Sequence, residues 1–153
     1  MRSQRGLPFP PSAPRRSSGR ASSHREHRGH RARRGRRHRK DYRAAIEVHR
    51  ILGPGLLESI YEEALCHELA PRNIEYQRQV PLIIHYKGKA LSGQRLDLVV
   101  LNEVVVEIKS ARAMPDNAMA QVLSYLKAST LKRALLINFG EKRVADGVKR
   151  ISL

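Results

Sequence analysis

Hydrophobic residues recur at helical spacing in two stretches that follow residue 41. The first stretch predicts a helix over about 42–51. Gly53-Pro54-Gly55 interrupts the pattern, and Pro54 suits the first turn of a second helix, which Pro71 and Asn73 end. The apolar face of this second helix comprises Leu57, Ile60, Ala64, Leu65 and Leu69.

The pattern then changes to alternation. Residues 80–86 predict a strand, and Lys87-Gly88-Lys89 predicts a tight turn into the next one. Two further strand-like runs, 96–100 and 104–109, are almost wholly apolar, which is typical of strands that are buried on both faces.

The remainder of the chain predicts one more helix and one or two more strands. Pro115-Asp116 begins the helix, whose apolar face is Ala118, Val122 and Leu126. Residues 135–139 form a buried strand that ends at Gly140, and 148–153 predict a last short strand. The predicted order α-α-β-β-β-α-β(-β) indicates a single α/β domain.

Two carboxylates and one lysine stand inside the apolar runs at Asp97, Glu107 and Lys109. An unpaired charge in such a place costs several kcal/mol or is neutralised through a shifted pKa. If residues 101–103 form the connecting loop, Val100 faces Val104, and Asp97 then lies opposite Glu107 with Cβ atoms roughly 5 Å apart. Like charges at this spacing call for a cation between them, and oxygen ligands suit Mg²⁺ or Mn²⁺.

Two alternatives stay open for these charges. A two-residue turn would shift the register and place Asp97 on the opposite face of the sheet. A solvated edge ladder would let Glu107 and Lys109, which share one face of their strand, simply point to water.

The charge of the chain is unevenly distributed. It has 30 Lys and Arg against 14 Asp and Glu, a net charge of +16. Residues 1–40 hold 14 of these bases and only one acid, so residues 41–153 are close to balance at +3. The proline- and arginine-rich segment 1–40 is predicted to be disordered, because it has little to bury, and 41–153 are predicted to form the folded domain.

Three explanations of residues 1–40 remain open: a basic arm that neutralises nucleic-acid phosphates, an organelle transit peptide, and an upstream stretch attached by a mis-assigned start codon. No apolar run approaches the ~18 residues of a membrane span, so no membrane partner is expected. The single cysteine, Cys66, fits a reducing compartment, and we expect a cytoplasmic protein.

Asp97 followed by Glu107-Ile108-Lys109 resembles the D…(D/E)-x-K signature of the restriction-endonuclease-like PD-(D/E)XK nuclease superfamily. Gly55-x-x-Glu58-x-x-Tyr61 is similar to the hallmark of the GxxExxY proteins. The segments 121–127 and 135–140 are similar to later blocks of that family. The resemblance covers roughly 42–153 and implies a restriction-endonuclease-like core with a mixed central sheet flanked by helices.

The resemblance also implies roles for individual residues. The acids Asp97, Glu107 and Glu58 and the carbonyl of Ile108 are implied to bind Mg²⁺ or Mn²⁺, and Lys109 to complete a catalytic set with the three acids. Gln121 and Tyr125 are implied to contact substrate, and they lie one helical turn apart. Members often carry a histidine shortly before that glutamine, where this chain has Asn117.

The function expected from these residues is metal-dependent hydrolysis of phosphodiester bonds in nucleic acid. Two alternatives remain open. The first is a domain of the same fold that binds nucleic acid or a protein without cutting, and the second is a basic tail that is itself the functional element. The oligomeric state and the choice between DNA and RNA are left open.

Overall fold

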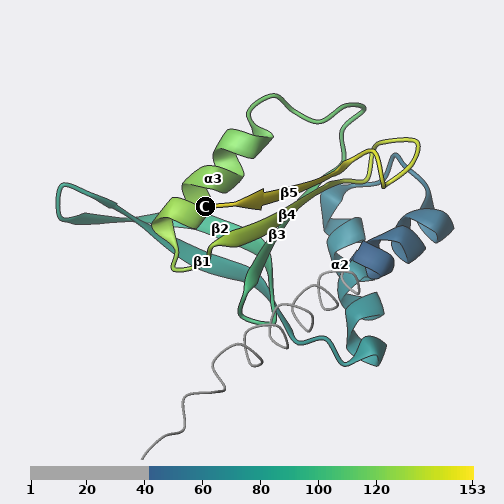
Figure 1. Ribbon diagram of the computed structural model, residues 1–153, viewed down its shortest axis with the longest axis horizontal. Helices are drawn as coiled ribbons and strands as arrows, with labels where there is room; N and C mark the ends of the chain where they lie inside the picture. Colours follow the sequence, from purple (N-terminus) through teal and green to yellow (C-terminus); the bar gives the residue numbers. More distant parts are fainter. Residues whose placement is uncertain (1–41) are drawn as a thin grey trace, which may run out of the picture.

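The computed structural model describes residues 42–153, and the predictions for residues 1–40 lie outside that range. Within it, a helix over 42–52 precedes all other elements (Figure 1). No helix in the described part is long and apolar enough to cross a membrane. The elements that follow are α2 (Glu58–Leu69), the 3-10 turn η1 (Ala70–Arg72), β1 (Tyr76–Tyr86), β2 (Lys89–Val100), β3 (Val104–Lys109), α3 (Ala118–Ala128), β4 (Arg133–Asn138) and β5 (Val148–Ser152).

The five strands form one mixed sheet in the order β1-β2-β3-β4-β5. Strands β3 and β4 are parallel and are connected through α3, whereas the other neighbours are antiparallel. β3 lies in the middle of the sheet and is buried along its length except at Lys109. The fold class expected from the sequence, a mixed central sheet flanked by helices, is confirmed.

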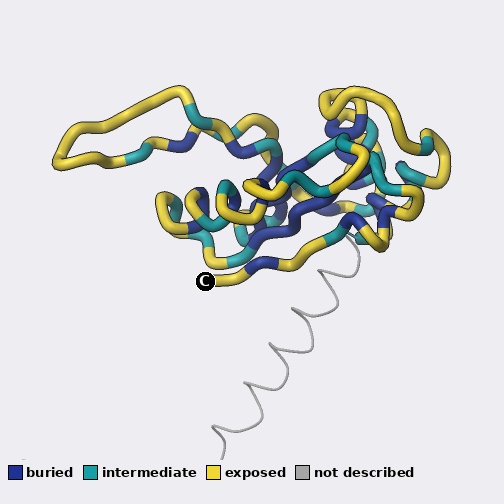
Figure 2. The backbone as a smooth tube through the Cα atoms, turned by 90° about the horizontal axis from the view of Figure 1, so that it is seen from above, coloured by how far each residue is buried: buried dark blue, intermediate teal, exposed yellow. Residues whose placement is uncertain are grey.

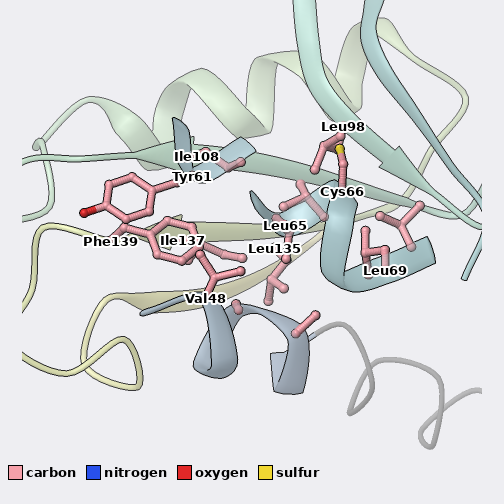
Figure 3. Packing of buried hydrophobic residues seen from close by; sticks show 14 of the residues in the cluster. Val48, Tyr61, Leu65, Cys66, Leu69, Leu98, Ile108, Leu135, Ile137 and Phe139 are labelled. Atoms are coloured by element: carbon pink, nitrogen blue, oxygen red, sulfur yellow. The ribbon is translucent and has the colours of Figure 1, made fainter. Parts of the chain in front are cut away.

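Helices cover both faces of the sheet, and the sheet separates the core into two clusters. The helix 42–52 and α2 pack on one face, where Tyr61 stacks on Phe139 with ring centroids 4.5 Å apart (Figure 3). α3 packs on the other face through Val122 and Leu126. A sheet that is covered on both faces explains why the run over β3 lacks polar alternation.

The loop between β2 and β3 has the predicted length. Leu101 and Asn102 both adopt a positive φ, near 54° and 53°, and Val100 pairs with Val104. The predicted register is therefore confirmed over the pairs that the ladder contains, which end at Leu98–Val106.

Two predicted helix starts are wrong. α2 begins at Glu58 and not at Pro54, because the segment before it is held as a loop: the Tyr61 hydroxyl donates to Gly53 O at 2.6 Å and accepts from Leu56 N at 3.1 Å. Gly55 has φ +106°, which no helix permits. α3 begins at Ala118, two residues after the predicted Pro115-Asp116 start.

Candidate active site

Asp97 lies where the regular alternation of side chains between the two faces of the sheet is broken. Leu98 belongs to the cluster under α2, but Leu96, which regular alternation would put on the same face, belongs to the cluster under α3. The ladder with β1 pairs Arg78 with Leu98 and Val80 with Leu96 but contains no pair between Gln79 and Asp97, and Gln79 has φ +49°. The paired strands exchange faces at this point, and the half-buried Asp97 lies at the exchange.

The Asp97 carboxylate accepts a backbone hydrogen bond from β3 where the β2–β3 ladder has ended. Its Oδ2 accepts the Ile108 N–H at 2.8 Å, just beyond the last β2–β3 ladder pair. Phe139 N donates to Lys109 O, so the backbone of Lys109 faces β4. Neighbouring residues of a strand direct their backbone groups to opposite sides, and the Ile108 carbonyl therefore faces the side where Asp97 lies.

Glu107 is the most deeply buried of the predicted site acids, with 3% of its surface exposed. Its Oε1 accepts from the Lys109 ammonium at 2.8 Å. Its Oε2 has no hydrogen-bond partner and is the only buried side-chain oxygen or nitrogen in this condition among the described residues. Burial raises the pKa of Glu107 from 4.5 to about 7, against the opposing effect of the bond to Lys109.

The neighbouring groups are perturbed in related ways. Burial raises the pKa of Asp97, and the Ile108 N–H that it accepts acts in the opposite direction. Burial lowers the pKa of Lys109, but the bond to Glu107 and the negative charges of the three surrounding acids together outweigh burial and raise the pKa. The negative charge of Glu58 contributes to the raised pKa of both Asp97 and Glu107, so these charges form one electrostatic cluster.

Glu58 reaches this cluster from the first turn of α2. Its Oε1 accepts from Ser110 N at 3.3 Å, directly after β3. The Ser110 hydroxyl in turn donates to Leu56 O at 2.5 Å. These two bonds fasten the start of α2 to the carboxyl end of the strand that carries Glu107 and Lys109.

Gln121 and Tyr125 border the site from α3. The Tyr125 hydroxyl accepts from Gln121 Nε2 at 2.5 Å and from Gln94 Nε2 of β2 at 2.7 Å. Burial raises the pKa of Tyr125, and the next largest cause is the charge of Glu107. The structure thus brings both predicted substrate residues to the edge of the acidic cluster.

The sequence interpretation missed Glu62. This buried carboxylate lies one turn after Glu58 on α2 and accepts from Arg78 Nε at 2.8 Å and from Gln79 Nε2 at 2.7 Å. Its charge contributes to the raised pKa of Asp97. The spacing of four residues from Glu58 was the signal that could have found it.

Asn138, at the end of β4, was also missed. It is fully buried, and its Oδ1 accepts from the backbone N–H of Ala111 and of Gly140, while its Nδ2 donates to Ala111 O. A polar residue that ends an apolar run was the available signal. Asn138 fixes the segment after Lys109 against the segment after β4.

This junction yields a prediction for Gly140→Ala. A Cβ at Gly140 would overlap the backbone of Ala111, which cannot move without breaking the bonds to Asn138. We expect a loss of about 1–3 kcal/mol in the free energy of unfolding, measured by urea denaturation. A change of less than about 0.5 kcal/mol, the range of ordinary surface substitutions, would contradict the close approach.

The residues present fit a divalent cation in part. The Oε2 atom of Glu107 has no hydrogen-bond partner and could serve as a cation ligand. Two further oxygen ligands lie nearby, on the same strand or beside it: the carbonyl of Ile108 and the carboxylate of Asp97. Within 42–153, however, no three His, Cys, Asp or Glu side chains lie close enough together to hold a metal ion. A cation would therefore rely on two carboxylates and a backbone carbonyl.

A comparison with protein families gives a match over most of the chain. The model of the PD-(D/E)XK nuclease superfamily matches residues 37–151, which is most of the chain. No curated protein and no solved structure is significantly similar to the chain. On the strength of the family match, the chain belongs to the PD-(D/E)XK nuclease superfamily.

Proposed function

We propose that the protein is a divalent-cation-dependent nuclease that hydrolyses phosphodiester bonds in nucleic acid. The observation that carries the proposal is the buried, unpartnered Oε2 of Glu107. A buried carboxylate oxygen without a partner is unfavourable in a resting protein. The same oxygen becomes favourable when it binds a cation or a polar group of a substrate. An unpartnered buried carboxylate oxygen is therefore more typical of a binding site than of a structural carboxylate.

In this proposal Asp97, Glu107 and the Ile108 carbonyl hold Mg²⁺ or Mn²⁺, and Glu58 supports them from α2. When bound, the cation supplies positive charge that polarises the scissile phosphate and favours ionisation of the attacking water. The raised pKa of Glu107 is consistent with this role, because a carboxylate that is hard to ionise alone gains most from a nearby cation.

Lys109 has two roles in the proposal. Its ammonium donates to Glu107 Oε1 and keeps that oxygen in place, and its side chain is 16% exposed, which allows contact with a phosphate oxygen. Lys109 would therefore orient the attacking water or offset the negative charge that develops on the phosphate. Gln121 and Tyr125 would contact the substrate from α3.

The finer assignment to the GxxExxY proteins is also a proposal. Its support is that each of the three motif positions has a physical role in the structure. Gly55 adopts φ +106°, Glu58 accepts from Ser110 N, and the Tyr61 hydroxyl bonds both sides of the loop. We also propose a cytoplasmic location, for which the free and buried Cys66 is the support.

A cleavage assay tests the proposed function. The full chain is incubated with single- and double-stranded DNA and RNA in Mg²⁺, in Mn²⁺ and in EDTA. We expect cleavage of at least one substrate with a divalent cation and none in EDTA. If wild-type protein binds these substrates but cuts none of them in either metal, the domain is a non-catalytic binder and the proposal fails.

A further inference from the structure

A β-hairpin projects from the body of the domain. β1 and β2 continue well past the last buried residue of β1, Leu82, and residues 83–93 contain no buried position. Figure 2 shows this segment as an exposed arm, and Figure 1 shows that it leaves the edge of the sheet beyond α3. No other described residues pack over its tip.

The arm is an ordered two-stranded ribbon. Ile84 pairs with Leu91, His85 with Ala90 and Tyr86 with Lys89. Lys87 and Gly88 form the two-residue turn with positive φ at both positions, near 45° and 82°, which matches the twist of a hairpin. The paired strands and the tight turn give the arm a regular ribbon geometry, and Ile84 packs against the cluster under α3 at its base.

The arm carries only positive charge and several exposed apolar side chains. Residues 83–93 include Lys87 and Lys89 and no Asp or Glu. Lys87 lies in the turn and Lys89 directly follows it, and the Lys87 ammonium lies 5.6 Å from the centre of the Tyr86 ring. Tyr86 itself is 59% exposed. The tip therefore combines two ammonium groups with an exposed aromatic ring.

We propose that this hairpin is an arm that enters the groove of a duplex nucleic acid and so makes a double-stranded polymer the substrate of the site. The proposal rests on the proposed nuclease function and names its substrate class. The major groove of B-form DNA is wide enough for a two-stranded β-ribbon. Lysines at the tip would contact the phosphates on the groove walls, and these contacts carry no sequence information.

The position of the arm relative to the acids supports a duplex. Lys89 precedes Asp97 by eight residues on the same strand, which at a rise of about 3.3 Å per residue separates them by roughly 26 Å. This distance is within one helical turn of B-form DNA, about 34 Å. A duplex can therefore lie on the site and meet the tip at the same time, whereas a flexible single strand has no groove for the ribbon.

The test compares two pairs of lysine substitutions in the full chain. Lys87→Ala/Lys89→Ala removes two charges from the tip. Lys132→Ala/Lys149→Ala removes two exposed charges from the opposite half of the sheet, one directly before β4 and one in β5. Affinity is measured by fluorescence anisotropy in EDTA, with a fluorescein-labelled duplex of about 20 base pairs and with one of its strands alone, over a series of salt concentrations.

We expect the tip variant to bind the duplex on the order of tenfold more weakly than wild type. The slope of log K against log salt should fall by about 2, since each lost phosphate contact removes about 0.9. The control pair should change both quantities much less, and the single strand should show little difference between the two variants. Because these measurements contain no cleavage step, they remain valid whether or not the protein cuts.

Three results would overturn the arm proposal while leaving the nuclease proposal intact. The first is an equal loss of duplex affinity in the tip and control variants. The second is an equal loss on duplex and single strand. The third is a wild-type dimer in sedimentation velocity that Tyr86→Glu converts to a monomer, because the exposed face of the hairpin would then be an interface between two copies of the chain.

Discussion

Replacing Asp97 by asparagine is expected to reduce Mg²⁺-dependent cleavage by at least about 10³-fold, because the charge stabilisation that a bound cation provides is worth several kcal/mol. Asparagine keeps an oxygen that can accept the Ile108 N–H, so the anchor between β2 and β3 survives. What it removes is the negative charge. The measurement is the initial rate of cleavage at saturating Mg²⁺, with the urea midpoint recorded for the same protein preparation.

Asp146→Asn is the matched control for this variant. Asp146 is an exposed aspartate that pairs with Arg143 outside the acidic cluster, so the same chemical change there should leave the rate within about twofold of wild type. An Asp97→Asn protein that folds normally and cuts at the wild-type rate would show that Asp97 serves only as a backbone anchor. Asp97 would then have no place in the proposed cation site.

Glu107→Gln should stabilise the metal-free protein at high pH. The folded-state pKa of Glu107 is raised from 4.5 to about 7, so the folded protein binds this proton more tightly than the unfolded chain does. The resulting stability is fully present below about pH 4.5 and is lost as the pH rises through about 7. Glutamine is neutral at every pH and keeps this stability, so well above pH 7 the free energy of unfolding of the variant should exceed that of wild type by on the order of 3 kcal/mol.

The measurement for Glu107 is urea denaturation in EDTA at several pH values between 4 and 9. The informative quantity is the difference between variant and wild type, which should be near zero at pH 4 and grow toward pH 9. Glu75→Gln, the same substitution at an exposed glutamate before β1, is the control for the chemical change. A difference that is flat with pH would contradict the assignment of Glu107 as a buried acid that titrates near neutrality.

The sequence predicted the parts of the fold that depend on local pattern. The unbroken apolar run of β3 predicted a strand buried on both faces, and the three residues 101–103 predicted the register that pairs Val100 with Val104. The two-residue period of that strand predicted that Glu107 and Lys109 share one face, and their charged groups lie 2.8 Å apart.

Features that depend on distant partners could not be predicted in this way. The exchange of faces at Asp97 needs the positive φ of Gln79 on the neighbouring strand, a conformation that no local pattern around Asp97 encodes. The late start of α2 depends on hydrogen bonds between the Tyr61 hydroxyl and the backbone of Gly53 and Leu56 in the preceding loop. For Glu62, the spacing from Glu58 could have marked a candidate, but its partners Arg78 and Gln79 on β1 could not be predicted.

The central claim is that Asp97 and Glu107 form a site for a divalent cation. Its most direct test is a calorimetric titration of Mg²⁺, a cation that takes oxygen ligands, into wild-type protein and into Glu107→Gln at pH 7. We predict binding to wild type with release of close to half a proton, because the Glu107 carboxyl is partly protonated at that pH before the cation enters. We predict no binding to Glu107→Gln. Equal Mg²⁺ binding by the two proteins, or no binding by wild type, would contradict the account.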